Sequence, residues 1–327
     1  FHRSLAALRV CSAERLLVDA LPGFDLAPRH VLTTSLGRGQ LAAAFRDLAP
    51  AAHITCWFMD LYPAQETHQL LHQEGRGVEV ICADELPEVE ADVVALPFSR
   101  GGESELARDL LQHGFDRLAH GGTLLTAVDN PKDVWLHHEI EKLQKGVTRI
   151  STRWGIVYRL RKTSPLKRLR DFTCEFAFRD GERLVKAVSR PGVFSHRQLD
   201  LGARALLETM TVGQGMRVVD MGCGSGAVGL AAALRAPDVH VTAIDSNARA
   251  VACTIAGAQL NGVDDRVTAI HAAEGEVDQT GTCDLVVGNP PYYSQYTIAE
   301  LFLQSARRPL RPGGQVLMFT KQAESFT

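Results

Sequence analysis

Residues 216–226 read Met-Arg-Val-Val-Asp-Met-Gly-Cys-Gly-Ser-Gly, and this stretch decides the fold. Its apolar first half is typical of a buried parallel strand. The three glycines that follow allow a turn with positive φ, whose backbone a ligand can approach closely. Residues 227–234 then have the composition of a helix, whose N-terminal amides favour an anionic group. A strand, a glycine-rich turn and a helix in this order predict an open α/β sheet.

Strands and helices alternate on both sides of this stretch. Short runs rich in Val and Ile predict the strands, and longer runs between them predict the helices. The predicted strands are residues 216–221, 239–244, 267–271, 284–288 and 315–319. The predicted helices are residues 227–234, 248–261 and 298–307. The alternation predicts a mostly parallel open sheet with helices on both faces.

The N-terminal half repeats this order. Residues 53–55, 91–94 and 121–125 match residues 240–242, 283–286 and 313–317, at a nearly constant offset. The matches predict two tandem Rossmann-like domains that arose by duplication. Chance similarity between two unrelated α/β domains is the alternative. We expect one domain at 1–163, a linker and entry segment at 164–190, and a second domain at 191–327.

The two copies differ where chemistry is expected. Residues 33–39 lack the acid and the first glycine of the later turn. Phe58 stands at the position of Asp245, and residues 97–100 stand at the positions of 289–292. We therefore expect the first copy to keep the scaffold without the site.

Composition excludes several classes of protein. Of 327 residues, 45% are hydrophobic and 22% are charged, which is ordinary for globular domains. No window has the ~18 apolar residues of a membrane span. Seven scattered cysteines without a C-x-x-C pair favour reduced thiols in the cytoplasm. We also predict no metal site, because residues 137–139 (His-His-Glu) lack the second histidine of a zinc motif. The chain begins with Phe1, so we expect it to derive from a longer gene product.

One stretch is strongly basic, although the net charge is only −3. Residues 149–170 hold eight Arg and Lys residues and no acid. They are interpreted either as a solvated strand edge and linker or as a surface that contacts phosphates. The candidate phosphate contacts are Arg161, Lys162, Lys167 and Arg168.

Two acids flank the glycine turn. Asp220 precedes the first glycine, where it can meet a cationic amino group. Asp245 ends the next predicted strand, where ribose hydroxyls bind in such folds, although a helix N-cap is the alternative. Cys223 lies inside the turn with no base paired to it, so we expect no nucleophile there.

The most specific motif is Asn289-Pro290-Pro291-Tyr292, directly after the predicted strand 284–288. The prolines fix the backbone and remove two N–H donors, which leaves carbonyl groups as acceptors. Asn289 adds a side-chain acceptor, and Tyr292 offers a ring for stacking. The motif predicts a site for a planar molecule with an amino group. A plain turn after a strand is the alternative.

With these motifs, the C-terminal half resembles class I S-adenosyl-L-methionine-dependent methyltransferases that methylate planar exocyclic amines. Residues 190–195 (Arg-Pro-Gly-Val-Phe-Ser) and 199–202 (Leu-Asp-Leu-Gly) make it similar to the bacterial ribosomal RNA guanine-N2 methyltransferases of the RsmC/RlmG type. That family pairs a degenerate, non-catalytic N-terminal domain with a catalytic C-terminal one, so the resemblance covers nearly the whole chain.

The resemblance implies the cofactor S-adenosyl-L-methionine and a ribosomal RNA or ribosomal subunit as partner. By position, it assigns cofactor contacts to Asp220, Gly222, Gly224, Gly226, Asp245, Ala273 and Phe194. It assigns the orientation of the target amine to Asn289 and the Pro290 carbonyl, and stacking on the base to Tyr292.

Two departures from the family pattern stand out. Ala272 and Ala273 occupy the place of a polar contact to adenine, so we expect backbone groups or Glu274 to serve instead. The chain also ends at Thr327, just after the fifth predicted strand, whereas the family sheet has two further strands. They are expected to be truncated or absent from this version.

The resemblance implies methylation of a guanine N2 amine in ribosomal RNA. Adenine N6 or a protein glutamine amide are alternative targets, because the same tetrapeptide serves them. A non-catalytic RNA-binding or assembly factor is the alternative from another class.

Overall fold

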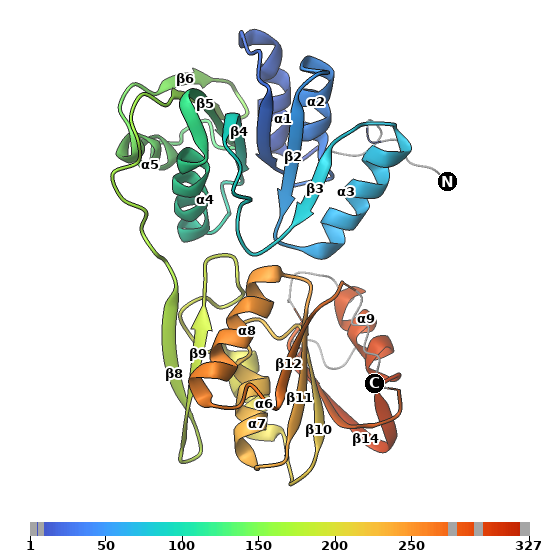
Figure 1. Cartoon of the computed structure of the whole chain (residues 1–327). Helices are drawn as coiled ribbons and strands as arrows, with labels where there is room; N and C mark the ends of the chain where they lie inside the picture. Colours follow the sequence, from blue (N-terminus) through green and yellow to red (C-terminus); the bar gives the residue numbers. More distant parts are fainter. Residues whose placement is uncertain (1–4, 6–9, 274–279, 291–296, 321–327) are drawn as a thin grey trace. The chain divides into compact units, whose positions relative to one another are not determined.

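The computed structural model describes residues 5, 10–273, 280–290 and 297–320 (Figure 1). The chain folds into two compact units, Phe1–Phe172 and Thr173–Thr327. We call them the first unit and the second unit. Within the described ranges, no helix combines the length and the apolar character that a membrane crossing requires.

The second unit contains a parallel sheet of five strands in the order β12-β11-β10-β13-β14. The strands are β10 (Arg217–Met221), β11 (His240–Asp245), β12 (Val267–His271), β13 (Cys283–Gly288) and β14 (Leu310–Met318). Each overlaps a predicted strand. β14 begins five residues earlier than predicted, because residues 310–314 also run along β13 through a register shift.

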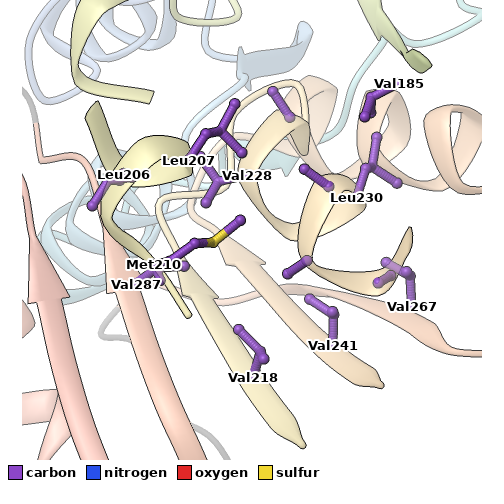
Figure 2. Close-up of a cluster of buried hydrophobic side chains, with 14 of the residues drawn as sticks. Val185, Leu206, Leu207, Met210, Val218, Val228, Leu230, Val241, Val267 and Val287 are labelled. Atoms are coloured by element: carbon purple, nitrogen blue, oxygen red, sulfur yellow. The ribbon is translucent and has the colours of Figure 1, made fainter. Parts of the chain in front are cut away.

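Helices cover both faces of this sheet, as predicted. They are α6 (Leu201–Thr209), α7 (Ala227–Arg235), α8 (Ala248–Asn261) and α9 (Thr297–Ala306). Leu206, Leu230 and Ala258 from the first three helices pack with strand residues such as Val218 in the larger core (Figure 2). Phe302 and Ala306 of α9 pack on the opposite face. Burial of each large aliphatic side chain contributes about 1.5–3 kcal/mol.

The segment 164–190 holds more structure than a linker. It contains the hairpin of β8 (Cys174–Asp180) and β9 (Arg183–Ser189). Val185 and Ala187 are fully buried in the core of the second unit. Asp180 forms an ion pair with Arg235 at 2.7 Å. The hairpin therefore belongs to the second unit, because its alternate residues bury apolar surface there.

The first unit has seven strands in the order β3-β2-β1-β4-β5-β7-β6. They are β1 (His30–Thr34), β2 (His53–Phe58), β3 (Glu79–Cys82), β4 (Ala91–Phe98), β5 (Leu118–Val128), β6 (Thr148–Ser151) and β7 (Ile156–Arg161). The first five strands pair in parallel, β7 pairs antiparallel with β5, and β6 pairs antiparallel with β7 at the edge.

The helices of the first unit also lie on both faces of its sheet. They are α1 (Ser12–Ala20), α2 (Gln40–Leu48), α3 (Leu61–Gln73), α4 (Ser104–Asp116) and α5 (Trp135–Leu143), with the short 3-10 helix η2 (Leu21–Gly23). One core contains Leu17 and Phe45 from α1 and α2. A separate core contains Phe115 and Ile140 from α4 and α5.

The two units share their central strand order and several local contacts. β3-β2-β1-β4-β5 has the same arrangement as β12-β11-β10-β13-β14. Asp92 accepts a hydrogen bond from the Arg29 amide at 2.8 Å, and Asp284 accepts one from the Arg217 amide at 2.7 Å. Gly122 and Gly314 occupy equally tight places, since a Cβ would lie 2.9 Å from the Ala119 carbonyl oxygen in the first unit and 3.0 Å from the Arg311 carbonyl oxygen in the second. These contacts support two copies of one Rossmann-like domain.

Candidate active site

The glycine turn between β10 and α7 has the conformation that its sequence demands. Gly222, Gly224 and Gly226 have φ of +67°, +57° and +74°, which side chains rarely adopt. A Cβ on Gly224 would meet no atom within 4 Å, so its backbone borders open space. A Cβ on Gly226 would lie 2.8 Å from the Thr254 hydroxyl. The turn therefore offers a bare backbone surface at the carboxyl edge of the sheet.

Asp220 lies behind this turn and is only 3% exposed. Strand alternation puts it on the same face as Val218, toward α7. Its carboxylate accepts a hydrogen bond from the Gly229 amide of α7 at 2.8 Å. This position differs from the expected direct contact with a cationic amino group. Burial, and to a smaller extent the charge of Asp245, raise the pKa of Asp220 to about 7 although the hydrogen bond from the Gly229 amide lowers it.

Asp245 is partly exposed and borders the turn from the end of β11. One carboxylate oxygen accepts from the Gly224 amide and the other from the Asn247 amide, both at 2.9 Å. The N-cap of α8 is Asn247, whose side chain accepts from the Arg249 and Ala250 amides. Asp245 is therefore not the helix cap, and its carboxylate lies against the glycine turn.

The segment 190–195 is held near the end of β11. Arg249, 1% exposed, donates to the Pro191 carbonyl at 2.8 Å, and Asn247 donates to the Gly192 carbonyl at 3.3 Å. Phe194 on this segment is 49% exposed. Ser195 and Arg197 have positive φ, a strained geometry that is common at functional sites.

Asn289 follows β13, and its amide is oriented by Asp200. The Asn289 amide nitrogen donates to the two Asp200 carboxylate oxygens at 3.2 and 3.1 Å. Asp200 also caps α6 by accepting from the Gly202 and Ala203 amides. A Cβ on Gly202 would lie 2.3 Å from the Asn289 carbonyl oxygen, so no larger residue fits without a shift. The start of α6 therefore fixes which end of the Asn289 amide is the donor.

The roles of Asp200 and Gly202 were not predicted. Residues 199–202 were recognisable only by their family resemblance. The available signal was an aspartate two residues before a glycine at the start of an apolar run, which is typical of a helix N-cap.

Asn289 and the glycine turn lie on adjacent strands. Gly288 pairs with Met221. The residues that follow them, Asn289 and Gly222, therefore lie side by side at the carboxyl edge of the sheet. The Phe302 ring covers both strand ends, since a Cβ on Gly222 or Gly288 would lie 3.0 or 3.1 Å from it. No sequence pattern indicated Phe302, because its contact depends on how α9 packs.

Other predicted site residues have varied positions. Pro290 is buried, and Ala273 lies just past β12, where the Ala272 amide donates to the Asp245 carbonyl at 3.1 Å. Tyr292 and Glu274 lie outside the described residues. Cys223 is buried, which together with the charge of Asp245 raises the pKa of its thiol well above the ordinary value. A neutral thiol is a poor nucleophile, so the site lacks covalent chemistry at Cys223.

The basic stretch needs one correction. Arg161, Lys167 and Arg168 are exposed, but Lys162 is buried. The Lys162 ammonium donates to the Asp116 carbonyl at the end of α4 and to the Leu118 carbonyl at the start of β5, and burial lowers its pKa. Lys162 is therefore removed from the candidate phosphate contacts. Over the described residues, no three His, Cys, Asp or Glu side chains gather closely enough to hold a metal ion.

The raised pKa of Asp220 makes a prediction about stability. An acid whose pKa is higher in the folded state than in the unfolded state loses stabilising effect as the pH rises from about 4 to about 7. Asp220→Asn keeps an acceptor for the Gly229 amide but cannot ionise. We expect the unfolding free energy of the variant to fall less steeply with pH over this range, by up to ~1.4 kcal/mol per pH unit.

Urea unfolding followed by circular dichroism at several pH values measures this difference. Asp265→Asn is the control, because the Asp265 side chain is 77% exposed. Identical pH profiles for wild type and Asp220→Asn would disprove the buried-acid interpretation.

Comparisons with known proteins fit this geometry. Residues 185–326 match the family model of the methyltransferase small domain. Two proteins named ribosomal RNA small subunit methyltransferase C, from Aliivibrio salmonicida and Pseudomonas aeruginosa, are 31% and 36% identical over 52% and 42% of this chain. The matches cover 49% and 41% of those proteins, so the chain spans about half their length or less.

A solved structure resembles nearly the whole chain. The T. thermophilus 16S rRNA N2 G1207 methyltransferase RsmC, in complex with AdoMet and guanosine, superposes with a TM-score of 0.77 at 21% identity. The match covers 95% of this chain and 85% of that one, which confirms the tandem fold. The sequence resemblance is confirmed: the second unit matches the methyltransferase small domain family, and the chain is similar to methyltransferases of the RsmC type.

Proposed function

We propose that this chain transfers a methyl group from S-adenosyl-L-methionine to the exocyclic N2 amine of a guanine in ribosomal RNA. The single observation that carries the proposal is the orientation of Asn289. Asp200 takes the donor end of its amide, so its carbonyl oxygen is the end that can accept from an amine. The proposed partner is ribosomal RNA or a ribosomal subunit, which puts the action in the cytoplasm.

The residues around the glycine turn fit the cofactor. The open space beside Gly224 allows a ligand to approach the backbone, and Asp245 at the end of β11 can accept from ribose hydroxyls. Phe194 and Ala273 are proposed to contact the rest of the cofactor. Asp220 would act indirectly, since its buried carboxyl holds α7 beneath the turn. When bound, S-adenosyl-L-methionine supplies an electrophilic methyl group on a sulfonium.

The chain's own task is to position the amine. A guanine amine is a weak nucleophile, because its lone pair delocalises into the ring. The Asn289 and Pro290 carbonyl oxygens would accept its two N–H groups and so direct the lone pair toward the methyl group. Positioning of this kind supplies most of the rate without a general base. The base must be unpaired or flipped out, and Tyr292 is proposed to stack on it.

The first prediction concerns the cofactor. One molecule of S-adenosyl-L-methionine should bind per chain, and Asp245→Ala should weaken binding by ~1–3 kcal/mol through lost hydrogen bonds. Isothermal titration calorimetry measures both quantities. Asp265→Asn again serves as the control, and two sites per chain would contradict the assignment to the second unit alone.

The second prediction concerns Asn289 and Asp200 together. Asn289→Ala should lower turnover by ~10²-fold or more with little change in cofactor affinity, as for a group that orients reactants. If Asp200 acts by holding Asn289, the Asp200→Ala change should cost little further turnover in the Asn289→Ala background. Single-turnover methylation of guanosine-containing RNA measures the four rates. Fully additive losses would show that Asp200 acts independently of Asn289.

The third prediction concerns RNA. Lys167→Glu with Arg168→Glu should weaken RNA binding and reduce the slope of log affinity against log salt by ~0.7–0.9 for each lost phosphate contact. Lys145→Glu is the control, because Lys145 is also exposed but is not one of the candidate phosphate contacts Arg161, Lys167 and Arg168. Superimposable salt titrations for the double variant and wild type would assign Lys167 and Arg168 to a solvated linker.

A further inference from the structure

The first unit contains a cavity that its altered motifs did not predict. The cavity has a volume of about 620 Å³ and lies at the carboxyl ends of β1, β2, β4 and β5. From β1 the chain first adds strands on one side of the sheet and then crosses over to add β4 on the other side. Ligands of open α/β sheets bind at such a switch point, between β1 and β4. Its volume is in the range of small-molecule sites.

The glycine turn beside this cavity is already occupied by a carboxylate of the chain itself. Glu14 of α1 is fully buried and accepts hydrogen bonds from the Ser35 hydroxyl and from the Leu36 and Leu41 amides. The Ser35 oxygen in turn accepts from the Gly37 and Gly39 amides at 3.0 Å. These amides are the donors with which a turn of this type holds an anion.

The chain thus fills its own anion site at the start of α2. The carboxylate of an amino-acid group would have to displace Glu14 from several hydrogen bonds. Phe58 also lines the cavity where the second unit has the acid Asp245. S-adenosyl-L-methionine therefore does not fit the chemistry of this cavity.

The walls of the cavity are aromatic and apolar. They include Trp57, Phe58, Phe98, Leu110 and Trp135. Aromatic walls of this kind favour a flat ring over a branched or flexible ligand.

The polar groups of the lining favour a neutral ligand with N–H donors. Among the described lining residues, Asp60, Glu103 and Asp133 are acids, and Arg38 and Arg100 are bases. Arg38 already forms an ion pair with Glu66 at 2.7 Å, and the Asp133 carboxylate accepts from the Tyr158 hydroxyl at 2.8 Å and from the Leu136 amide at 3.3 Å. The excess of carboxylates disfavours phosphate groups, whereas carboxylate oxygens accept from ring and amino N–H groups.

We propose that the cavity of the first unit binds an uncharged nucleobase, with its ring against the aromatic walls and its N–H groups toward the acids. The base comes either from a free nucleoside or from an unpaired nucleotide of RNA, since both offer the same chemistry. The proposal does not depend on the reaction of the second unit.

Tryptophan fluorescence tests the proposal selectively. All three tryptophans of the chain, at positions 57, 135 and 154, belong to the first unit, and two of them line the cavity. The full chain is titrated with adenosine, guanosine, their 5′-monophosphates, S-adenosyl-L-methionine and a short single-stranded RNA. We expect saturable quenching by a nucleoside or by the RNA, weaker quenching by the monophosphates and none by S-adenosyl-L-methionine.

Variants locate the signal. Ala107→Phe fills the cavity from α4 and should raise the half-saturating concentration about tenfold or more, the effect of losing one good packing contact. Trp135→Phe should weaken the quenching and Trp154→Phe should preserve it, because Trp154 is 65% exposed and does not line the cavity. Asn289→Ala should leave the quenching unchanged. Trp135→Phe decides the outcome if Ala107→Phe does not fold.

The titrations distinguish a free nucleoside from an RNA base as the ligand, and they can also overturn the proposal. Tighter binding of RNA than of nucleosides assigns the cavity to an RNA base, and the reverse order assigns it to a free nucleoside. Absence of saturable quenching in the folded chain overturns the proposal. Quenching with unchanged amplitude and unchanged half-saturating concentration in both Ala107→Phe and Trp135→Phe also overturns it, as does equal quenching by S-adenosyl-L-methionine.

Discussion

The hydrogen bond from the Gly224 amide to the Asp245 carboxylate joins the two halves of the candidate site. It ties a turn that only glycines can form to the end of the neighbouring strand β11. The glycine turn also determines where α7 begins, and the Gly229 amide of α7 donates to the buried Asp220. These contacts place the partly exposed Asp245 at the edge of the sheet and bury Asp220 behind the turn. The two acids differ in burial, so the pKa of Asp220 rises while Asp245 stays beside the open turn.

The first unit solves the same structural problem with a different residue. Its turn also needs a carboxylate to satisfy backbone amides, and Glu14 from α1 provides it. Burial raises the pKa of Glu14, and hydrogen bonds from Leu41, Ser35, Leu36 and Gly37 oppose that shift. The acid in the second unit comes from the strand beside the turn and remains partly exposed, whereas Glu14 comes from a covering helix and is closed off. The turn of the second unit can therefore bind a ligand, whereas the backbone amides of the turn in the first unit already donate to Glu14.

Most of the fold could be predicted from the sequence, because buried parallel strands and glycine turns have strong local patterns. The order of β10 to β14 and the duplication followed from such patterns. The hairpin of residues 174–189 was missed, since β8 has only two buried positions and β9 has four, and the helix that covers β9 is the distant α8. Lys162 was misassigned for a related reason: composition cannot show that a lysine in a basic run points inward onto the Asp116 and Leu118 carbonyls.

Some residues of the candidate site could be predicted from local sequence, whereas others depend on tertiary packing. Asn289 was identifiable because its neighbours form a tetrapeptide with a clear chemical meaning. Asp200 lies 89 residues earlier and gains its role only when α6 packs beside β13. The same aspartate caps α6 and fixes the Asn289 amide, so a local rule for helix starts and a tertiary requirement of the site converge on one side chain. Gly202 is constrained for the same reason, because any Cβ would displace the oxygen that Asp200 has oriented. The geometry at Asn289 therefore depends on a helix start whose sequence looks purely structural.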